Sequence, residues 1–218
     1  MFEDRLSYEG REKRGRVRRG AEVPGEDLGR IISLTDGVFA FALTLLVLGL
    51  TVPAVASGQL AGALRSDWPK FLGYVFAFVM IAVWWTYHHR IFRYIERYDT
   101  VLMWLNMAVL IEIAVMPFVL QVYTAYPQAQ AAVVLFAVIE AATGATLNVL
   151  WRYASAGHRL IDPKLSPPEI RYFATTGLIT PVVFLGSIAV SFVSVDAAQY
   201  SWFLAIAARG VIRRYGVD

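Results

Sequence analysis

Three carboxylates lie inside apolar stretches, where their types and positions could support ion or proton chemistry. Asp36 falls in the first third of the first apolar stretch, and Glu112 and Glu140 fall near the middles of two later ones. A carboxylate in hydrocarbon costs about 3 kcal/mol on insertion scales unless it is paired or hydrogen-bonded. Asp36 is therefore a structural anchor or part of a site. Glu112 and Glu140 form a proton or cation path, or they are neutral or bonded to Asn106, Asn148 or a hydroxyl.

The histidines do not form a chelating or catalytic pattern. His88 and His89 are adjacent, so on a helix they point about 100° apart and cannot act as an i, i+4 pair. They could instead hydrogen-bond the first helix near Thr35 and Asp36, or sense pH. The sequence has no H-E-x-x-H, G-x-S-x-G or G-x-x-x-x-G-K-[ST] pattern. We expect no enzyme, no metal site and no cofactor.

Composition predicts the elements that position these residues. The 218 residues are 57% hydrophobic and 17% charged, which is typical of an integral membrane protein. We expect an all-α protein with a charged N-terminal tail over 1–27 and a transmembrane domain over 28–215. Six membrane helices are predicted: one from Asp27 to before Pro53, then about 68–89, 100–123, 127–153, 168–194, and Asp196 to about Arg209.

Charge along the chain predicts the topology. Arginine and lysine gather in the N-terminal tail, in the second-to-third and fourth-to-fifth connections and at the C-terminal end, whereas the other connections hold only Arg65 and Lys70. By the positive-inside rule, this alternation favours six spans in the cell membrane with both termini cytoplasmic. The basic tail either contacts anionic lipid headgroups or only fixes topology. We expect no nucleic-acid partner, because the basic residues belong to loops and tails.

The first helix has two distinct faces. At about 100° per residue, one arc of roughly 100° contains Phe41, Thr44, Leu45 and Leu48, which we call the stripe. The other side holds Asp36, Phe39, Ala40, Leu43 and Val47. Both faces could be ordinary helix packing. We expect Asp36 to bind neighbouring helices through His88, Trp84, Trp85 or Asn106.

Residues 30–40 resemble the R-x-x-x-F-S-D-x-x-x-A signature of the transmembrane protein 175 family of potassium channels. Arg30, Asp36 and Ala40 match it, while Leu34 stands in place of Phe and Thr35 in place of Ser. Residues 42–48 are also similar to bacterial members. Residues 84–90 and 104–106 resemble the ends of the second and third helices of the family, which include Trp84, His88 and Asn106.

The resemblance implies a prokaryotic single-repeat member that assembles as a homotetramer, with the first helix of each subunit lining a central pore. It places the constriction on Phe41, Leu45 and Leu48, with Thr44 supplying a layer of hydroxyls. Phe41 departs from the branched aliphatic residue usual in the family. The T-V-G-Y-G filter is absent, so selectivity in such a channel must have another source.

The first functional hypothesis is therefore a potassium-selective cation channel that conducts through an apolar constriction and gates by excluding water. Its expected partners are a second copy of itself, the lipid bilayer and potassium ions. The alternative is a proton-coupled secondary transporter that uses Glu112 and Glu140. A membrane enzyme or scaffold is a third reading. Reversal potentials in potassium and sodium gradients would separate a channel from the other two.

Overall fold

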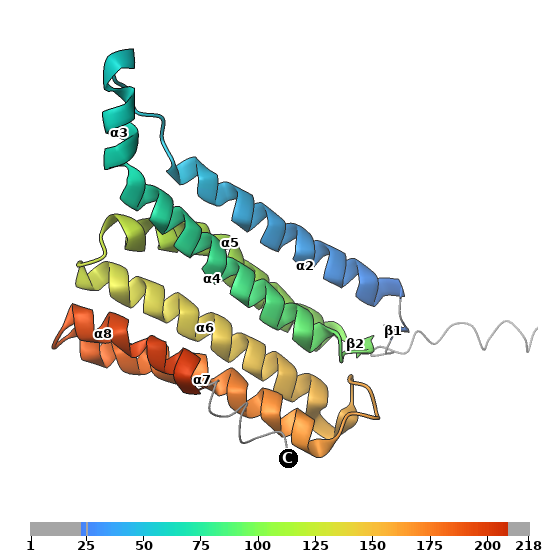
Figure 1. Cartoon of the computed structure of the whole chain (residues 1–218). Helices are drawn as coiled ribbons and strands as arrows, with labels where there is room; N and C mark the ends of the chain where they lie inside the picture. Colours follow the sequence, from blue (N-terminus) through green and yellow to red (C-terminus); the bar gives the residue numbers. More distant parts are fainter. Residues whose placement is uncertain (1–22, 25, 209–218) are drawn as a thin grey trace, which may run out of the picture.

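The structure is a computed structural model that describes residues 23, 24 and 26–208, and most of it is helical (Figure 1). Five long helices dominate: α2 Glu26–Leu45, α4 Trp68–Phe92, α5 Thr100–Ala125, α6 Gln130–Ser155 and α7 Pro167–Ser191. The smaller elements are β1 Val23–Pro24, η1 Leu46–Gly49, η2 Ser57–Gln59, α3 Leu60–Ser66, β2 Arg97–Tyr98, η3 Ala156–His158 and α8 Val195–Ser201. Most of the predicted tail over 1–27 and the basic C-terminal end lie outside the described residues.

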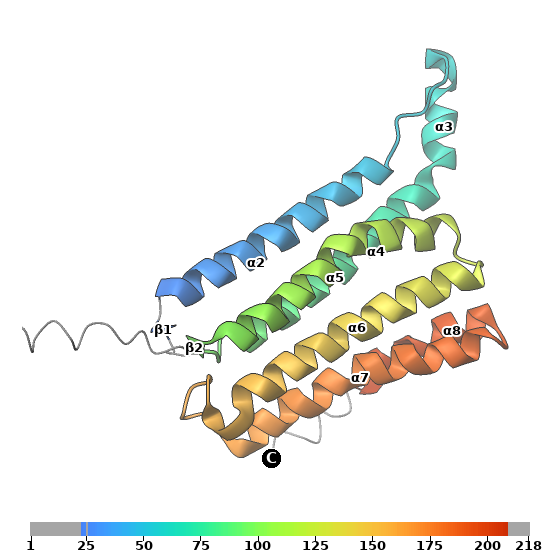
Figure 2. The same ribbon diagram turned by 180° about the vertical axis from the view of Figure 1, so that it is seen from behind.

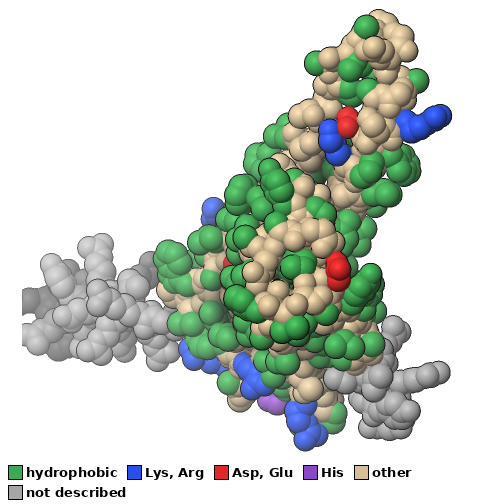
Figure 3. Space-filling model, turned by 90° about the vertical axis from the view of Figure 1, so that its left-hand side faces the viewer, with side chains coloured by type: hydrophobic (Ala, Val, Ile, Leu, Met, Phe, Trp, Pro, Cys, Tyr) green, Lys and Arg blue, Asp and Glu red, His purple; other side chains and the backbone are tan. Residues whose placement is uncertain are grey.

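Each of the five long helices is long and apolar enough to cross a membrane. Their bounds lie within three residues of the predicted helices, except at the end of the first helix, where the α-helical geometry stops at Leu45. Hydrophobic side chains cover much of the face seen in Figure 3, and charged side chains are sparse on it. The chain is therefore a helical, multi-pass membrane protein.

The sixth predicted helix is interrupted. α8 has seven residues, a turn follows at Trp202, and helical geometry resumes over 203–208, where the described part of the chain ends. Figure 1 shows α8 lying beside α7 at one edge of the bundle. A continuous sixth membrane span stays a prediction.

The helices are packed to different depths. Figures 1 and 2 show α2 at the edge of the bundle opposite α7 and α8, with α4, α5 and α6 between them. In the most apolar 18 residues of the span Gln130–His158, which contains α6, 56% of the residues are buried. In the corresponding part of Leu28–Gly49, which contains most of α2, 22% are buried. The core therefore lies around α6, and α2 leaves much of its apolar surface uncovered within one subunit.

The connections at the two ends differ in shape. At one end, β1 pairs with β2, and Ile95 forms a bridge with Ile161, so the N-terminal segment and the α4–α5 and α6–α7 connections lie together. Asp99 fastens this end by accepting hydrogen bonds from the Leu102 amide, the Tyr153 hydroxyl and Arg159. At the other end, α3 projects away from the bundle (Figure 1).

Candidate functional site: the first helix and its contacts

The stripe on the first helix is largely open to the surroundings of the single subunit. Phe41 is 65% exposed and Leu48 72% exposed, Thr44 is exposed, and Leu45 is half-buried. The Thr44 hydroxyl donates to the Phe41 carbonyl oxygen at 2.8 Å. This bond uses the hydroxyl hydrogen within the helix and leaves oxygen lone pairs for another donor or a cation.

The stripe is not α-helical at its end, Leu48. The i, i+4, i+7 spacing of Phe41, Leu45 and Leu48 puts them on one side only if the α-helix continues through all three. α2 ends at Leu45, and η1 continues as a 3₁₀ turn to Gly49 before Leu50 becomes extended. In 3₁₀ geometry, residues three apart eclipse one another. Leu48 therefore lies more nearly in line with Leu45 along the helix axis than α-helical geometry would place it.

The buried face of α2 lies on the side of Thr35. Among the described side chains of α2, those of Leu28, Thr35, Phe39 and Ala42 are buried, and Leu46 in η1 continues the same face. Asp36 and Ala40 are exposed, Val47 is 50% exposed, and Leu43 is partly buried against the core. The buried face is centred about a quarter turn from Asp36, nearly opposite the stripe. The helical wheel grouped Asp36, Ala40 and Val47 with Phe39 and Leu43 on the side away from the stripe. Of these, Phe39 is buried and Leu43 partly so, because α4 and α5 contact α2 from the Thr35 side.

Asp36 bonds to a neighbouring helix, as expected, and its partner is one of the four residues that the sequence offered. The Trp85 indole N–H donates to Asp36 Oδ1 at 2.9 Å. The same indole stacks on His89, with ring centres 5.4 Å apart. Trp84 points elsewhere and donates to Glu140 Oε2 at 3.1 Å. Consecutive residues on a helix diverge by about 100°, so both tryptophans could not have reached Asp36.

A buried polar chain joins three helices next to Asp36. Asn106 donates its amide N–H to Thr35 Oγ1 at 2.9 Å, and its amide oxygen lies 2.8 Å from His88 Nε2. All three residues are at most 3% exposed. The His88 ring is stacked on Phe92, with centres 4.1 Å apart. This chain links α2 to α4 through α5. The sequence offered His88 a hydrogen bond to the first helix itself, whereas its hydrogen bond goes to Asn106, and Asn106 is the residue that reaches Thr35.

Two other residues of the signature lie on the exposed side of the helix. Arg30 and Ala40 are exposed on α2. Their part in the site therefore stays a prediction, as does the pore-lining role of the stripe.

The two remaining intramembrane acids have separate partners. Glu112 Oε1 accepts from the Thr146 hydroxyl at 2.8 Å, and Glu140 accepts from Trp84. Glu140 and Thr146 lie on the same helix six positions apart, hence about 9 Å along its axis and about 120° apart around it. The two carboxylates face different parts of the bundle. Asn106 and Asn148, offered as partners for them, bond instead to Thr35 and to the Ala174 carbonyl.

Sequence reasoning missed the pairing of Trp84 with Glu140. The signal was present in part, because a buried acid in a membrane helix needs a donor and Trp84 is one of the few donors in the apolar stretches. What the sequence lacked was the rotation of α4 relative to α6.

The chain is similar to channels that are already known. A family model described as the endosomal/lysosomal potassium channel TMEM175 matches residues 30–117. A potassium channel of Chamaesiphon minutus is 35% identical over 181 residues, which cover 80% of this chain and 89% of the relative. A potassium channel of Streptomyces collinus is 30% identical over 192 residues, or 86% of this chain and 90% of the relative.

One solved structure is similar along most of the chain. The crystal structure of a lysosomal potassium-selective channel TMEM175 homolog from Chamaesiphon minutus superposes with a TM-score of 0.70 at 30% sequence identity. The match covers 89% of this chain and 100% of the other. The likeness therefore extends well beyond the signature, to the arrangement of the whole bundle.

Proposed function

The chain belongs to the TMEM175 family, and from that premise we propose that it is a potassium-conducting channel that assembles as a homotetramer around α2. The observation that carries the proposal is the exposure of the stripe. A single subunit presents Phe41, Thr44 and Leu48 outward from an edge helix, on the side opposite the face that packs into the bundle. Four such helices around an axis would enclose a path that one subunit cannot enclose.

In the proposed pore, Phe41, Leu45 and Leu48 each form an apolar ring of four. Such rings offer no ligand to an ion, so the closed state holds back ions by excluding water. Modest widening lets water and partly hydrated ions pass. Potassium holds its hydration shell less tightly than sodium, and the Thr44 hydroxyl layer supplies oxygens at the point where water is lost. We propose this combination as the origin of potassium preference.

We also propose that both termini lie in the cytoplasm of a cell whose membrane the channel spans. The N-terminal segment and the α4–α5 and α6–α7 connections lie at one end of the bundle. These connections carry basic residues, namely Arg93, Arg97, Arg159 and Lys164. Cytoplasmic loops carry such an excess of Lys and Arg.

The test is the reversal potential of the purified protein in bilayers under opposing potassium and sodium gradients. Wild-type channels should reverse near the potassium equilibrium potential. Leu45→Asn, and more so Phe41→Asn, should raise the resting current and weaken potassium preference, because a polar ring wets the neck. Thr44→Ala should keep the barrier and reduce selectivity.

The matched control is Leu43→Asn on the same helix. Leu43 is partly buried against the core, so this change should lower stability without opening the pore. If well-folded Leu43→Asn conducted freely and Leu45→Asn did not, the stripe would not be the constriction. Absence of any ion current from stable wild-type protein, with transport coupled to a proton gradient, would favour the transporter instead.

A further inference from the structure

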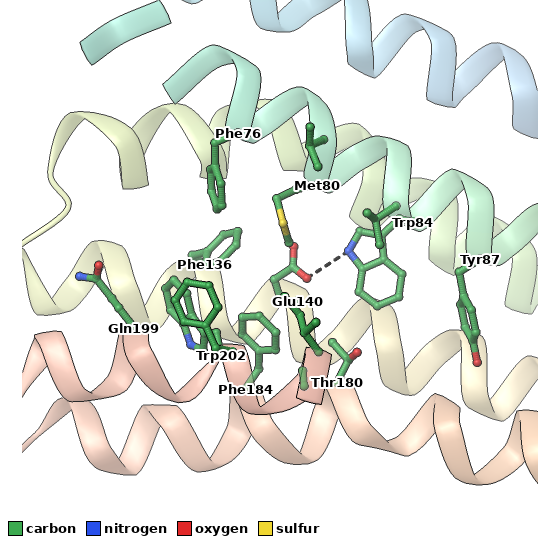
Figure 4. A pocket seen from close by; sticks show the side chains of 15 residues that line it. Phe76, Met80, Trp84, Tyr87, Phe136, Glu140, Thr180, Phe184, Gln199 and Trp202 are labelled. Carbon is green, nitrogen blue, oxygen red and sulfur yellow. Dashed lines mark hydrogen bonds between the residues drawn. The ribbon is translucent and has the colours of Figure 1, made fainter. Parts of the chain in front are cut away.

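A cavity of about 350 Å³, which we call the groove, opens between α4, α6, α7 and the segment that follows α8 (Figure 4). None of the described residues of α2 lines it, so it is separate from the proposed pore. Several side chains at its mouth are exposed, among them Val79, Val83 and Phe203. In a multi-pass membrane protein such side chains face lipid hydrocarbon. The groove is therefore open to the acyl chains of the bilayer.

The groove runs along the helices for about the depth of one leaflet. Its lining residues on α4 extend from Phe76 to Tyr87, which is about 16 Å of helix axis. Figure 4 shows Tyr87 at one end of the lining side chains, with Phe76 and Gln199 toward the other. Half of the hydrocarbon core of a bilayer is about 15 Å thick. A single acyl chain of one leaflet can therefore lie along the groove.

The inner wall of the groove is apolar and preformed. Trp202 lies between Phe136 and Phe184, with ring centres 4.9 and 5.3 Å away. These mutual contacts fix the rings in place. Glu140 also belongs to this wall, but it is 1% exposed and accepts a hydrogen bond from the Trp84 indole N–H. The surface that an occupant meets is therefore suited to methylene groups.

Three helices meet at one glycine at the Tyr87 end of the groove. A Cβ added to Gly177 of α7 would lie 2.7 Å from the Tyr87 hydroxyl of α4 and 2.5 Å from Asn148 Nδ2 of α6. Residues three or four positions apart lie on the same face of a helix. One turn nearer the α4–α5 and α6–α7 connections, the same faces of α4 and α6 carry Arg90 and Arg152. Two arginines therefore lie just beyond this end of the groove.

Both arginines are anchored to a single turn of α7. The guanidinium carbon of Arg90 lies 5.8 Å from the centre of the Phe173 ring. Arg152 Nε donates to Asn148 Oδ1 at 2.9 Å, and the Asn148 amide donates to the Ala174 carbonyl at 2.7 Å. Stacking on a ring occupies the face of a guanidinium, and a bond from Nε leaves its Nη donors. The exposed arginines thus retain in-plane donors, whose geometry matches phosphate oxygens.

The charge at this end selects a negative headgroup. Exposed Arg171 lies on the same turn of α7 as Phe173, while Glu169, the acid before it on α7, accepts from the amide and hydroxyl of Ser166 in a capping box. Basic sites between membrane helices attract anionic headgroups, whereas a zwitterionic headgroup brings an ammonium group that the arginines repel. We propose that the groove binds an anionic phospholipid, with its phosphate against Arg90 and Arg152 and one acyl chain along the aromatic wall.

The first test titrates delipidated full-length protein in detergent with palmitoyl-oleoyl phosphatidylglycerol and counts bound lipid by native mass spectrometry. Wild type should bind it saturably, and should bind phosphatidylcholine with the same chains more weakly. Arg90→Gln should weaken phosphatidylglycerol binding roughly tenfold or more, as for loss of a hydrogen bond to a charged group. Arg65→Gln is the matched control, since it makes the same change of charge on α3, which projects from the opposite end of the bundle, and it should leave the affinity unchanged.

The second test concerns the acyl chain. Val79→Trp places a large side chain in the groove and should weaken phosphatidylglycerol binding. Val75→Trp on the same helix is its control, because Val75 is 54% exposed, against 51% for Val79, and does not line the groove. Glycerol 3-phosphate, which carries the phosphate without acyl chains, should not compete with the lipid.

A third measurement uses the wild-type protein alone, in case the variants do not fold. Phosphatidylglycerol with a diazirine on its acyl chain should photolabel peptides that line the groove, and excess unlabelled phosphatidylglycerol should suppress the label. The proposal is overturned if phosphatidylcholine binds as tightly, if Arg90→Gln binds no more weakly than Arg65→Gln, if Val79→Trp binds undiminished, or if the label is spread evenly over the helices. None of these measurements depends on ion current, so a failure here is distinct from a failure of the proposed channel.

Discussion

At the scale of single residues, the Thr35 hydroxyl takes part in the buried hydrogen bonds between helices, whereas the Asp36 carboxylate lies at the surface. Thr35 is fully buried and accepts from Asn106, which in turn contacts His88. Asp36 is exposed and accepts a hydrogen bond from the Trp85 indole N–H. In the family signature these positions are Ser and Asp. Thr35 preserves the hydroxyl, and this explains how the departure from serine can be accommodated.

The first prediction concerns this hydroxyl. Thr35→Val keeps the shape of the side chain but leaves a buried Asn106 donor without its acceptor, which costs about 1–3 kcal/mol. The thermal unfolding temperature in detergent should fall. Thr35→Ser should behave nearly as wild type. Ser33→Ala on the same helix is the control, because the Ser33 hydroxyl is exposed and donates to the Gly29 carbonyl of its own helix. An equal loss of stability in that variant would contradict the interpretation.

The second prediction concerns Asp36. Asp36→Ala removes the acceptor of the Trp85 indole N–H, and Trp85→Phe removes the donor. If the pair acts as a unit, the two changes should not add in a double-mutant cycle. We expect each to lower the fraction of intact tetramer in native mass spectrometry more than it shifts the reversal potential. Stable tetramers of Asp36→Ala with altered ion preference would mean that Asp36 faces the ions.

At the scale of elements, the contact between α6 and α7 depends on glycines. α6 and α7 approach each other at Gly144, where an added Cβ would lie 2.8 Å from Pro181 Cδ, and at Gly177, where it would lie 2.5 Å from Asn148 Nδ2. Small residues allow membrane helices to pack this closely. The same contact holds Asn148 in position to donate to the Ala174 carbonyl at 2.7 Å. α6 and α7 are therefore tightly packed at these two glycines, with no room for a larger side chain at either.

The third prediction is that Gly177→Ala destabilises this pair. The methyl group would overlap Asn148 and the Tyr87 hydroxyl, the latter at 2.7 Å, and overpacking of this kind costs about 1–3 kcal/mol. Thermal unfolding should shift downward. Gly186→Ala on the same helix is the control, since nothing lies within 4 Å of the added carbon and alanine is the better helix former. A comparable loss in both variants would show that the effect is not steric.

At the scale of the whole molecule, the helices are unevenly buried. α2 and the η1 turn that follows it have an exposed apolar face at the edge of the bundle, with Leu34 and Val47 each 50% exposed and Leu48 72%. A membrane environment covers lipid-facing apolar residues without a partner, so exposure alone does not fix an oligomer. Asp36 and Thr44 on this helix are polar and exposed, and the hydrocarbon of lipid offers them no hydrogen-bond partners.

The fourth prediction is therefore a tetramer. Native mass spectrometry of the wild-type protein in mild detergent should give a mass of four chains. Phe41→Asn should leave that mass unchanged if Phe41 faces an axial pore rather than a neighbouring subunit. A monomeric wild type that still conducts would contradict the proposed pore around α2.

The sequence alone was sufficient for the family, the membrane class and the bounds of the long helices. Apolar stretches of this length can cross a bilayer only as helices, because every backbone polar group needs an internal partner there. The helical wheel also placed the stripe and Asp36 on different sides of the first helix, since α-helical periodicity is independent of what the helix touches. The family assignment, made on the signature around Asp36, is confirmed by relatives that match over most of the chain.

Tertiary structure decided which neighbours each helix meets. The sequence could not show that Thr35 rather than Asp36 points inward, that Trp84 reaches Glu140 while Trp85 reaches Asp36, or that α2 becomes a 3₁₀ turn after Leu45. In each case the local pattern permits more than one rotation or ending of the helix. The choice depends on contacts between residues far apart in sequence, such as the 71 positions between Thr35 and Asn106, and those contacts exist only once the bundle has formed.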